Sequence, residues 1–240
     1  MRRDCLASVL LVGFCISAQA ETGPCKPDRF HGLTCGEGAG AARVVDGTTS
    51  PSKRLAFAWR SPGHTTDAPD SDAVESLLIR LADGAVLAHA AGDYWNTGTR
   101  IVNRYQESAS WSPDSRYVVE TENFRSQTIY IQLYFIGADD KVAALDVKSI
   151  VEPAARKYLR RIGKDERDYA FQIYGGTNDD KPQITIDNGG VIKALVMMNI
   201  ARPEFSAVML DVTFKAAESH GTLSAREVSI RRSKIEPYAH

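Results

Sequence analysis

The sequence lacks an excess of charge of either sign. Its 240 residues contain 29 Lys and Arg against 30 Asp and Glu, which leaves a formal net charge of -1. A balanced chain has no electrostatic pull toward nucleic acid or acidic lipid. We therefore expect no nucleic-acid partner.

Long hydrophobic runs are also missing. A membrane-spanning helix needs about 20 consecutive apolar residues, and the apolar stretch Leu6–Ile16 is too short. It follows the basic pair Arg2 and Arg3 and precedes Ala18-Gln19-Ala20, which is the pattern of a signal peptide cleaved near Ala20. We expect residues 1–20 to be removed, giving a periplasmic or secreted protein whose mature chain has no integral membrane segment.

Cysteine is scarce. Cys5 and Cys15 fall within the expected signal peptide, so the mature chain keeps only Cys25 and Cys35. In an oxidising compartment such a pair is expected to form a disulfide, which stabilises by about 2–3 kcal/mol. The alternative is a metal clip that adds His31, but two thiolates and one imidazole fall short of the four ligands of structural zinc. The disulfide would fasten a Gly-rich leader, residues 21–48.

Catalytic signatures are absent as well. The chain has no Gly-x-Ser-x-Gly elbow, no His-Glu-x-x-His motif and no phosphate-binding loop. Its histidines are scattered, at positions His31, His64, His89, His220 and His240. We assign no catalytic residue and no cofactor. Because catalytic groups also assemble from distant positions, an enzyme is not excluded.

No regular metal-binding loop is present either. Two acidic segments could offer oxygen ligands, namely Asp67, Asp70, Asp72 and Glu75 in one loop and Asp179 and Asp180 in another. Neither has the turning glycine and closing glutamate of a regular calcium loop. We assign no metal site.

The sequence is rich in period-two alternation, which is typical of β-strands. Leu55, Phe57 and Trp59 alternate with small or basic residues, and the set Ile129, Ile131, Leu133 and Phe135 is expected to face one side of a strand. Asp83-Gly84 predicts a hairpin turn. Further strands are expected near residues 77–81, 85–90, 117–121, 142–147, 169–174, 183–186, 191–200, 205–215 and 223–232.

The stretch ASWSPDSRYVVETE, residues 109–122, combines an aromatic residue, a polar turn and an alternating run. Ser112-Pro113-Asp114-Ser115 has the chemistry of a type I turn, with proline at its second position and Asp114 able to bond the following backbone. We interpret Trp111, Ser112, Pro113 and Asp114 as a structural turn, with Trp111 packed in the core, rather than as a catalytic site.

This unit occurs twice. SPSKRLAFAWR at residues 50–60 parallels SPDSRYVVETE at residues 112–122, and residues 74–90 parallel residues 128–146. The unit resembles the blades of TolB-like and WD40-like β-propellers, whose repeats carry a Ser-Pro-Asp-Gly turn. Here Ser115 stands in place of the glycine, and Ser52 in place of the aspartate. The resemblance implies blade-like units at about 49–95 and 109–148.

Two copies are too few for a closed ring of four to eight blades. We therefore expect a mainly β protein with a single β-rich domain over residues 49–240. Its sheet is expected to be either an antiparallel, propeller-blade-like meander or an open sandwich-like sheet. One substantial α-helix is expected at about 150–162, where apolar residues fall at helical spacing. Ser149 and Glu152 predict its capping box, and Gly163 predicts its end.

Aromatic residues form the remaining candidate site. Tyr94, Trp95 and Tyr105 lie near Trp111 in the sequence and could form a platform for carbohydrate or peptide, although such residues are more often inter-strand core. The sequence favours a non-catalytic exported binding module for a protein or cell-envelope partner. A small secreted hydrolase is the alternative, and a cleft holding His64 or His89 against two carboxylates would favour it.

Overall fold

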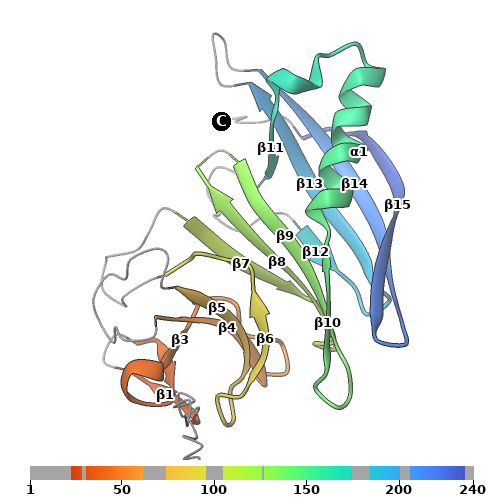
Figure 1. Cartoon of the computed structure of the whole chain (residues 1–240). Coiled ribbons are helices and arrows are strands. Elements are labelled where there is room, and N and C mark those ends of the chain that lie inside the picture. The colour runs from red at the N-terminus through yellow and green to blue at the C-terminus, as the bar shows by residue number, and fades with distance from the viewer. Residues whose placement is uncertain are drawn as a thin grey trace, which may run out of the picture.

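The computed structural model describes residues 23–28, 31–61, 74–95, 105–125, 127–174, 184–200 and 206–235. The expected fold class is confirmed, because these residues form three antiparallel sheets and one α-helix (Figure 1). The expected signal peptide, residues 1–20, lies outside the described residues, as do His64, Asp67, Asp70, Asp72, Asp179, Asp180 and His240.

The N-terminal sheet has six strands in sequence order: β1 (Cys25–Pro27), β2 (Leu33–Cys35), β3 (Ala42–Val44), β4 (Leu55–Arg60), β5 (Glu75–Arg80) and β6 (Val86–Ala90). A short 3-10 helix, η1 (Gly38–Gly40), precedes β3. The Gly-rich leader is thus not a separate appendage, since it supplies the first three strands of this sheet. Its Val44 and Val45 are buried, so the leader adds apolar surface to the core.

The middle sheet is a four-stranded meander. It consists of β7 (Tyr105–Trp111), β8 (Tyr117–Phe124), β9 (Gln127–Ile136) and β10 (Val142–Asp146). The C-terminal sheet has the path β11 (Ala170–Ile173), β13 (Val191–Ile200), β14 (Ser206–Ser219) and β15 (Thr222–Arg232), with β12 (Ile184–Ile186) also paired to β13. The helix α1 (Lys148–Arg161) and a short 3-10 helix, η3 (Glu166–Asp168), connect these two sheets.

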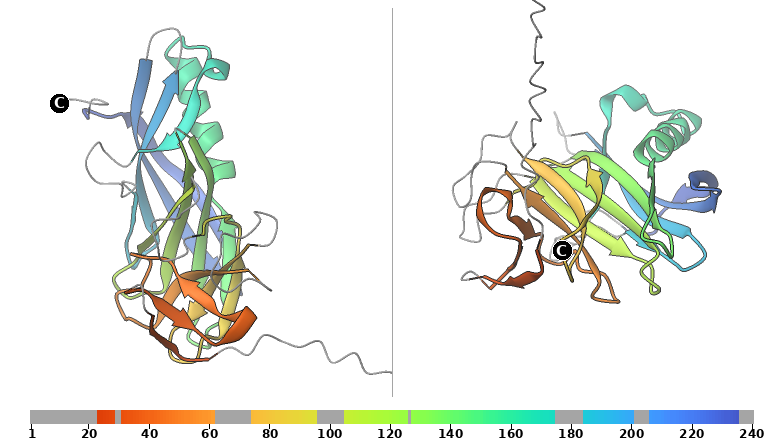
Figure 2. Two further views of the ribbon diagram at one scale, coloured as in Figure 1. Left: turned by 90° about the vertical axis from the view of Figure 1, so that its left-hand side faces the viewer. Right: turned by 60° about the horizontal axis from the view of Figure 1, so that its bottom comes forward.

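The middle sheet is covered on both faces. One face carries Val119, Ile131 and Leu133, which join α1 and the C-terminal sheet in the larger hydrophobic core. The opposite face carries Val118 and Tyr134, which pack against the N-terminal sheet in a second core. The N-terminal and C-terminal sheets therefore lie toward opposite ends of the molecule, with the middle sheet between them (Figure 2).

Local turn chemistry explains where the strands begin and end. The chain reverses between β5 and β6 at Gly84, which has φ +69° and donates its N–H to the carbonyl oxygen of Arg80 at 2.8 Å. Between β9 and β10, Gly137 and Lys141 are joined by a backbone hydrogen bond of 2.8 Å. The turn at Gly84 lies where the sequence predicts a hairpin.

The helix begins differently from the sequence prediction. It starts at Lys148, after the N-cap residue Val147, whose side chain makes no capping hydrogen bond, and the expected capping box of Ser149 and Glu152 does not form. Instead the N–H of Ser149 donates to the carboxylate of Asp146 at 3.2 Å, while Glu152 pairs with Arg156 one turn further on. The carboxylate of Asp146 thus accepts the first-turn N–H for which the capping box would otherwise compete. The expected end holds, with Gly163 at φ +76°.

A β-bulge corrects a second expectation. Ile129 does not share the buried face of Ile131 and Leu133, because the pairing of β8 with β9 shifts register and passes from Tyr130 to Thr128. Ile129 is the extra residue, and it is 37% exposed. An extra residue breaks the alternation of faces, and here it brings Thr128 into the interior, where its hydroxyl donates to Asn123 Oδ1 at 2.6 Å.

No helix in the described part of the chain has both the length and the apolar character needed to cross a membrane.

Candidate functional site

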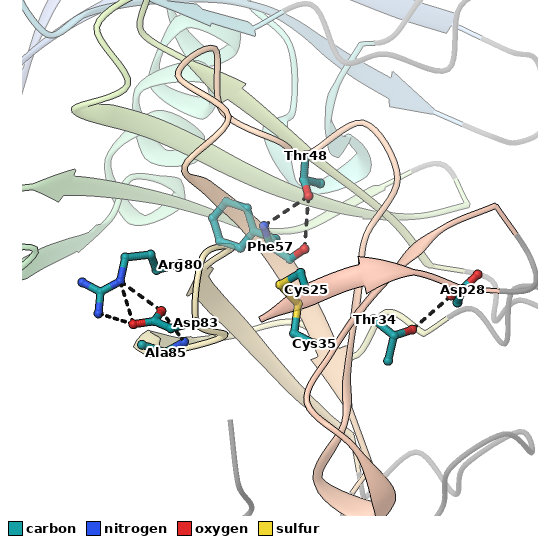
Figure 3. The surroundings of a disulfide bond; sticks show 9 residues. All are labelled: Cys25, Asp28, Thr34, Cys35, Thr48, Phe57, Arg80, Asp83 and Ala85. Carbon is teal, nitrogen blue, oxygen red and sulfur yellow. Dashed lines mark hydrogen bonds and ion pairs between the residues drawn. A yellow bond between two sulfur atoms is a disulfide. The ribbon is translucent and has the colours of Figure 1, made fainter. Parts of the chain in front are cut away.

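The disulfide expected from the sequence is present. Cys25 and Cys35 are paired opposite each other on β1 and β2 and are bonded through their sulfur atoms (Figure 3). The backbone N–H of Cys25 also donates to the carbonyl oxygen of Leu81 at 3.1 Å, which ties this strand pair to the end of β5. The disulfide therefore fastens the N-terminal sheet, and no unpaired cysteine remains in the described residues.

The side chains at the Ser-Pro-Asp turn make packing contacts and hydrogen bonds that hold the turn in place. The indole Nε1 of Trp111 donates to the carbonyl oxygen of Thr48 at 2.8 Å, and its ring lies 6.3 Å from that of Phe57. The hydroxyl of Ser112 donates to Asp114 Oδ1 at 2.6 Å, and Pro113 follows it in the turn. Trp111 therefore joins this turn to the N-terminal sheet, and the hydrogen bond between Ser112 and Asp114 orders the turn itself. Asp114 also lines a pocket at the surface.

The aromatic residues do not gather into one platform. Tyr94 and Trp95 are half-buried and pack against the core between the N-terminal and middle sheets. Tyr105 stacks instead on Phe124, with ring centroids 5.0 Å apart. The arrangement thus places Tyr94 and Trp95 beside a buried polar region that the local sequence pattern does not predict.

That region is a group of polar side chains between the N-terminal and middle sheets, here named the interlayer cluster. It comprises Trp59, Ser61, Ser76, Glu107, Glu120, Glu122, Tyr130 and Tyr134. Strand pairing brings the carboxyl groups together, because Glu107 on β7 lies directly opposite Glu122 on β8, and Glu120 is on the same face two residues earlier.

The three carboxyl groups are buried. Glu107, Glu120 and Glu122 are 9%, 0% and 1% exposed. Glu120 Oε2 accepts a hydrogen bond of 2.8 Å from the hydroxyl of Tyr134, and Glu122 Oε2 accepts one of 2.9 Å from the backbone N–H of Asp93. Both oxygens of Glu107 and the Oε1 of Glu120 have no hydrogen-bond partner within the described part of the chain.

Burial of these carboxyl groups favours their neutral forms. It raises the pKa of Glu120 to about 7 and that of Glu122 to about 8. The pKa of Glu107 is raised well above its usual range, first by burial and then by the charges of Glu120 and Glu122. The pKa of the Tyr130 hydroxyl is raised for the same reasons. At neutral pH the cluster therefore keeps protons that exposed carboxyl groups would release.

The facing side of the N-terminal sheet contributes donors. Trp59 and Ser76 are directly opposite each other on β4 and β5, and Ser61 follows β4 on the same face as Trp59. The indole Nε1 of Trp59 and the hydroxyls of Ser61 and Ser76 are buried without a hydrogen-bond partner. Unpaired buried donors thus face unpaired buried acceptors across one layer.

A weak sequence signal for this cluster exists. Glu120 and Glu122 interrupt an otherwise apolar alternation after Val118, and alternation alone places all three on the face opposite Val119. The contribution of Glu107 depends on the register between β7 and β8, and those of Trp59 and Ser76 depend on sheet stacking, which local patterns do not determine.

A second feature is a groove on the outer face of the C-terminal sheet, the face turned away from α1. Its volume is about 540 Å³. The residues that line it include Ile184, Thr185, Lys193, Leu195, Asp211, Thr213, Arg231 and Ile235. Arg231 Nε lies 3.3 Å from Asp211 Oδ2. The groove therefore combines apolar surface with charged groups that remain accessible to solvent.

The described histidines do not join the carboxyl groups. His31, His89 and His220 are exposed. Within the described ranges, no three His, Cys, Asp or Glu side chains converge in a way that could hold a metal ion. The carboxyl groups of the interlayer cluster are thus accompanied by tyrosine, tryptophan and serine side chains.

Comparison with known proteins adds no family. No protein-family model matches the chain, and no curated protein matches it.

Proposed function

We propose that this protein is an exported, non-catalytic binding module that holds a protein or cell-envelope partner, in the periplasm or outside the cell, after cleavage near Ala20. The observation that supports this proposal is the groove on the outer face of the C-terminal sheet. A groove with an apolar floor and a few directed polar groups is typical of binding surfaces.

The chemistry of the groove suits an extended segment of a partner. Ile235, which is exposed, offers apolar contact, while Lys193 and Arg231 offer donors and positive charge beside it. Arg231 is paired with Asp211 in an exposed position, where such a pair contributes little stability, so the arginine can exchange that carboxylate for one of the partner. We therefore expect the partner to present an acidic group next to apolar side chains.

We also interpret the N-terminal and middle sheets as two copies of one blade-like unit, in line with the resemblance to TolB-like and WD40-like repeats. Each unit ends in an antiparallel meander, β4-β5-β6 in the first and β8-β9-β10 in the second. This interpretation supports a scaffold for binding, because the repeat type is defined by a turn and a sheet and carries no catalytic group of its own.

The alternative function, a small secreted hydrolase, has one observation in its favour, which is the cluster of carboxyl groups with raised pKa values. Acid–base catalysis by two carboxyl groups needs environments that push their pKa values apart. Here burial raises the pKa values of Glu107, Glu120 and Glu122 in the same direction. We therefore rank catalysis below binding.

Affinity capture tests the proposal. The mature protein, immobilised and exposed to its own envelope fraction, is expected to recover one partner consistently. The double variant Lys193→Glu, Arg231→Glu is expected to lose that partner, because it reverses both positive charges of the groove. A matched control reverses two exposed charges near α1, Lys157→Glu with Lys164→Glu, and is expected to keep the partner.

Two results would count against the proposal. Retention of the partner by the Lys193, Arg231 double variant would remove the groove from the binding surface. Recovery of no partner by the mature protein, together with turnover in a broad hydrolase screen that Glu120→Gln abolishes, would favour the hydrolase instead.

A further inference from the structure

The interlayer cluster contains several unpaired polar atoms, although packing between two sheets requires none. Acceptors without a donor are both carboxyl oxygens of Glu107, one of Glu120 and the hydroxyl oxygen of Tyr130. Donors without an acceptor are the indole of Trp59 and the hydroxyls of Ser61 and Ser76. These atoms come from two different sheets, and Trp59 of one sheet belongs to the same core as Val118 and Tyr134 of the other.

Buried polar groups destabilise the folded protein unless they form hydrogen bonds. Each buried polar group that loses its hydrogen bonds to water costs about 1–3 kcal/mol, and buried polar atoms left unpaired are rare in native proteins. The same layer is apolar further along, where Phe57 packs against Tyr134 with ring centroids 5.6 Å apart. The sequence thus places polar groups at one end of a layer that could have been apolar throughout.

The charge of the carboxyl groups indicates which kind of ligand would bond to the cluster. When they are ionised, Glu107, Glu120 and Glu122 carry up to three negative charges. The nearest basic side chain along β4, Arg60, alternates to the other face and pairs with Glu75 at 2.7 Å. No lysine, arginine or histidine bonds to these carboxyl groups in the described ranges. A ligand that supplies both N–H donors and a positive charge would satisfy them.

The surroundings agree with an organic rather than an inorganic cation. No three acidic, histidine or cysteine side chains in the described ranges converge as metal ligands do. Aromatic residues line the layer instead, with Trp59 buried and Tyr94 and Trp95 packed beside it, and aromatic faces attract organic cations. The chain also passes closely at Gly92, where an added Cβ would lie 2.5 Å from the Tyr130 hydroxyl oxygen and 2.9 Å from Glu122 Oε2.

From these observations we propose that the interlayer cluster binds a small protonated amine that also carries a hydrogen-bond acceptor. The ammonium group has three N–H donors, which match the unpaired oxygens of Glu107, Glu120 and Tyr130. The acceptor on the same ligand accepts hydrogen bonds from the unpaired donors of Trp59, Ser61 and Ser76. This site is separate from the groove of the C-terminal sheet, so it does not depend on the proposed partner.

Calorimetric titration of the full mature protein tests the proposal with matched pairs of probes. Ethanolamine and glucosamine are expected to bind with saturation, whereas ethylene glycol and glucose, which lack the amine, are expected not to bind. Binding of a cation favours the ionised carboxyl groups, so it should release protons, and the heat should change between buffers of different ionisation enthalpy. Tryptophan fluorescence is expected to change in parallel, because Trp59 lies in the site.

Variants keep the test specific. Glu107→Gln and Glu120→Gln preserve shape and are each expected to weaken amine binding at least tenfold, since they remove the charge that the ammonium group faces. Glu227→Gln, on the exposed side of β15, is the matched control and is expected to bind as the parent does. Circular dichroism confirms that each variant is folded, so that lost binding is not lost structure.

Several outcomes would overturn the proposal. One is equal binding of the amine and its neutral counterpart, and another is undiminished amine binding in both glutamine variants. Saturable binding of Ca²⁺ that competes with the amine would assign the site to an inorganic cation. Absence of saturation by either amine up to about 10 mM would show that the cluster holds only water and protons.

Discussion

The backbone N–H of Ser52 donates a hydrogen bond of 3.0 Å to the hydroxyl oxygen of Ser115. Ser52 is the third residue of the turn that leads into β4, and Ser115 is the fourth residue of the turn that leads into β8. The two Ser-Pro turns therefore touch each other, although 63 positions separate the bonded residues. This contact joins the N-terminal sheet to the middle sheet at one end of the layer between them.

The two turns are built alike. In each, the first serine donates its N–H to the carbonyl oxygen of the residue five positions later, at 2.9 Å for Ser50 and 2.9 Å for Ser112. In each, its hydroxyl accepts the N–H of that same later residue, at 3.1 Å in the first turn and 2.9 Å in the second. The fourth residue has positive φ in both, 57° for Lys53 and 61° for Ser115. These positions are where the resembled repeats have glycine.

Lys53→Gly is expected to raise the free energy of unfolding by about 0.5–1 kcal/mol, because glycine adopts positive φ without the steric cost that lysine has there. Ser115→Gly is the matched comparison, and it should gain less, since it also removes the acceptor of the Ser52 N–H. Urea denaturation of both variants measures the difference. Equal gains in the two variants would show that the contact between the turns contributes no stability.

The turns could be predicted from sequence because their chemistry is local. Pro113 and Asp114 set the backbone of one turn, and alternation assigns Glu120 to the face opposite Val119, which is the face on which the structure has it. The interlayer cluster could not be predicted, because Glu107 meets Glu122 only through the register of β7 with β8. The strands of the leader could not be predicted for the same reason, since β3 is short and gains its apolar contacts by pairing with β4.

The start of α1 shows how one neighbouring side chain changes a local prediction. Asp146→Ala is expected to lower the free energy of unfolding by about 1 kcal/mol, because the carboxylate of Asp146 accepts the N–H of Ser149 in the first turn. Ser149→Ala keeps that backbone donor and should cost less. Thermal or urea denaturation of the two variants decides, and a larger loss for Ser149→Ala would restore the capping box as the device that starts the helix.

The bulge in β9 separates two isoleucines that alternation treats alike. Ile131→Ala is expected to cost about 2–5 kcal/mol, because the side chain is fully buried in the larger core. Ile129→Ala is expected to cost under 1 kcal/mol, because Ile129 is the extra, exposed residue of the bulge. The two variants have the same change of side chain, so their urea midpoints compare position alone. Similar losses at both sites would contradict the register shift.

The interlayer cluster also determines how stability depends on pH. Glu107, Glu120 and Glu122 have folded-state pKa values above their ordinary range near 4.5. The groups that face them are Tyr130 and Tyr134 from β9 and Asp93 from the loop after β6. The folded protein therefore binds more protons than the unfolded chain between about pH 4.5 and pH 8, and its stability must fall as the pH rises through that window.

The size of this fall is expected to be several kcal/mol, because one unit of pKa difference corresponds to about 1.4 kcal/mol and the pKa values of Glu120 and Glu122 lie near 7 and 8. Carboxyl groups with lowered pKa values, such as Asp165 at about 2, act only in acid and do not overlap with this window. Urea denaturation at about pH 5.5 and pH 8.5 measures the fall, and Glu120→Gln is expected to reduce it, because glutamine cannot ionise. A stability that stays level or rises with pH would mean that these carboxyl groups are ionised in the folded protein, with solvent reaching the layer between the two sheets.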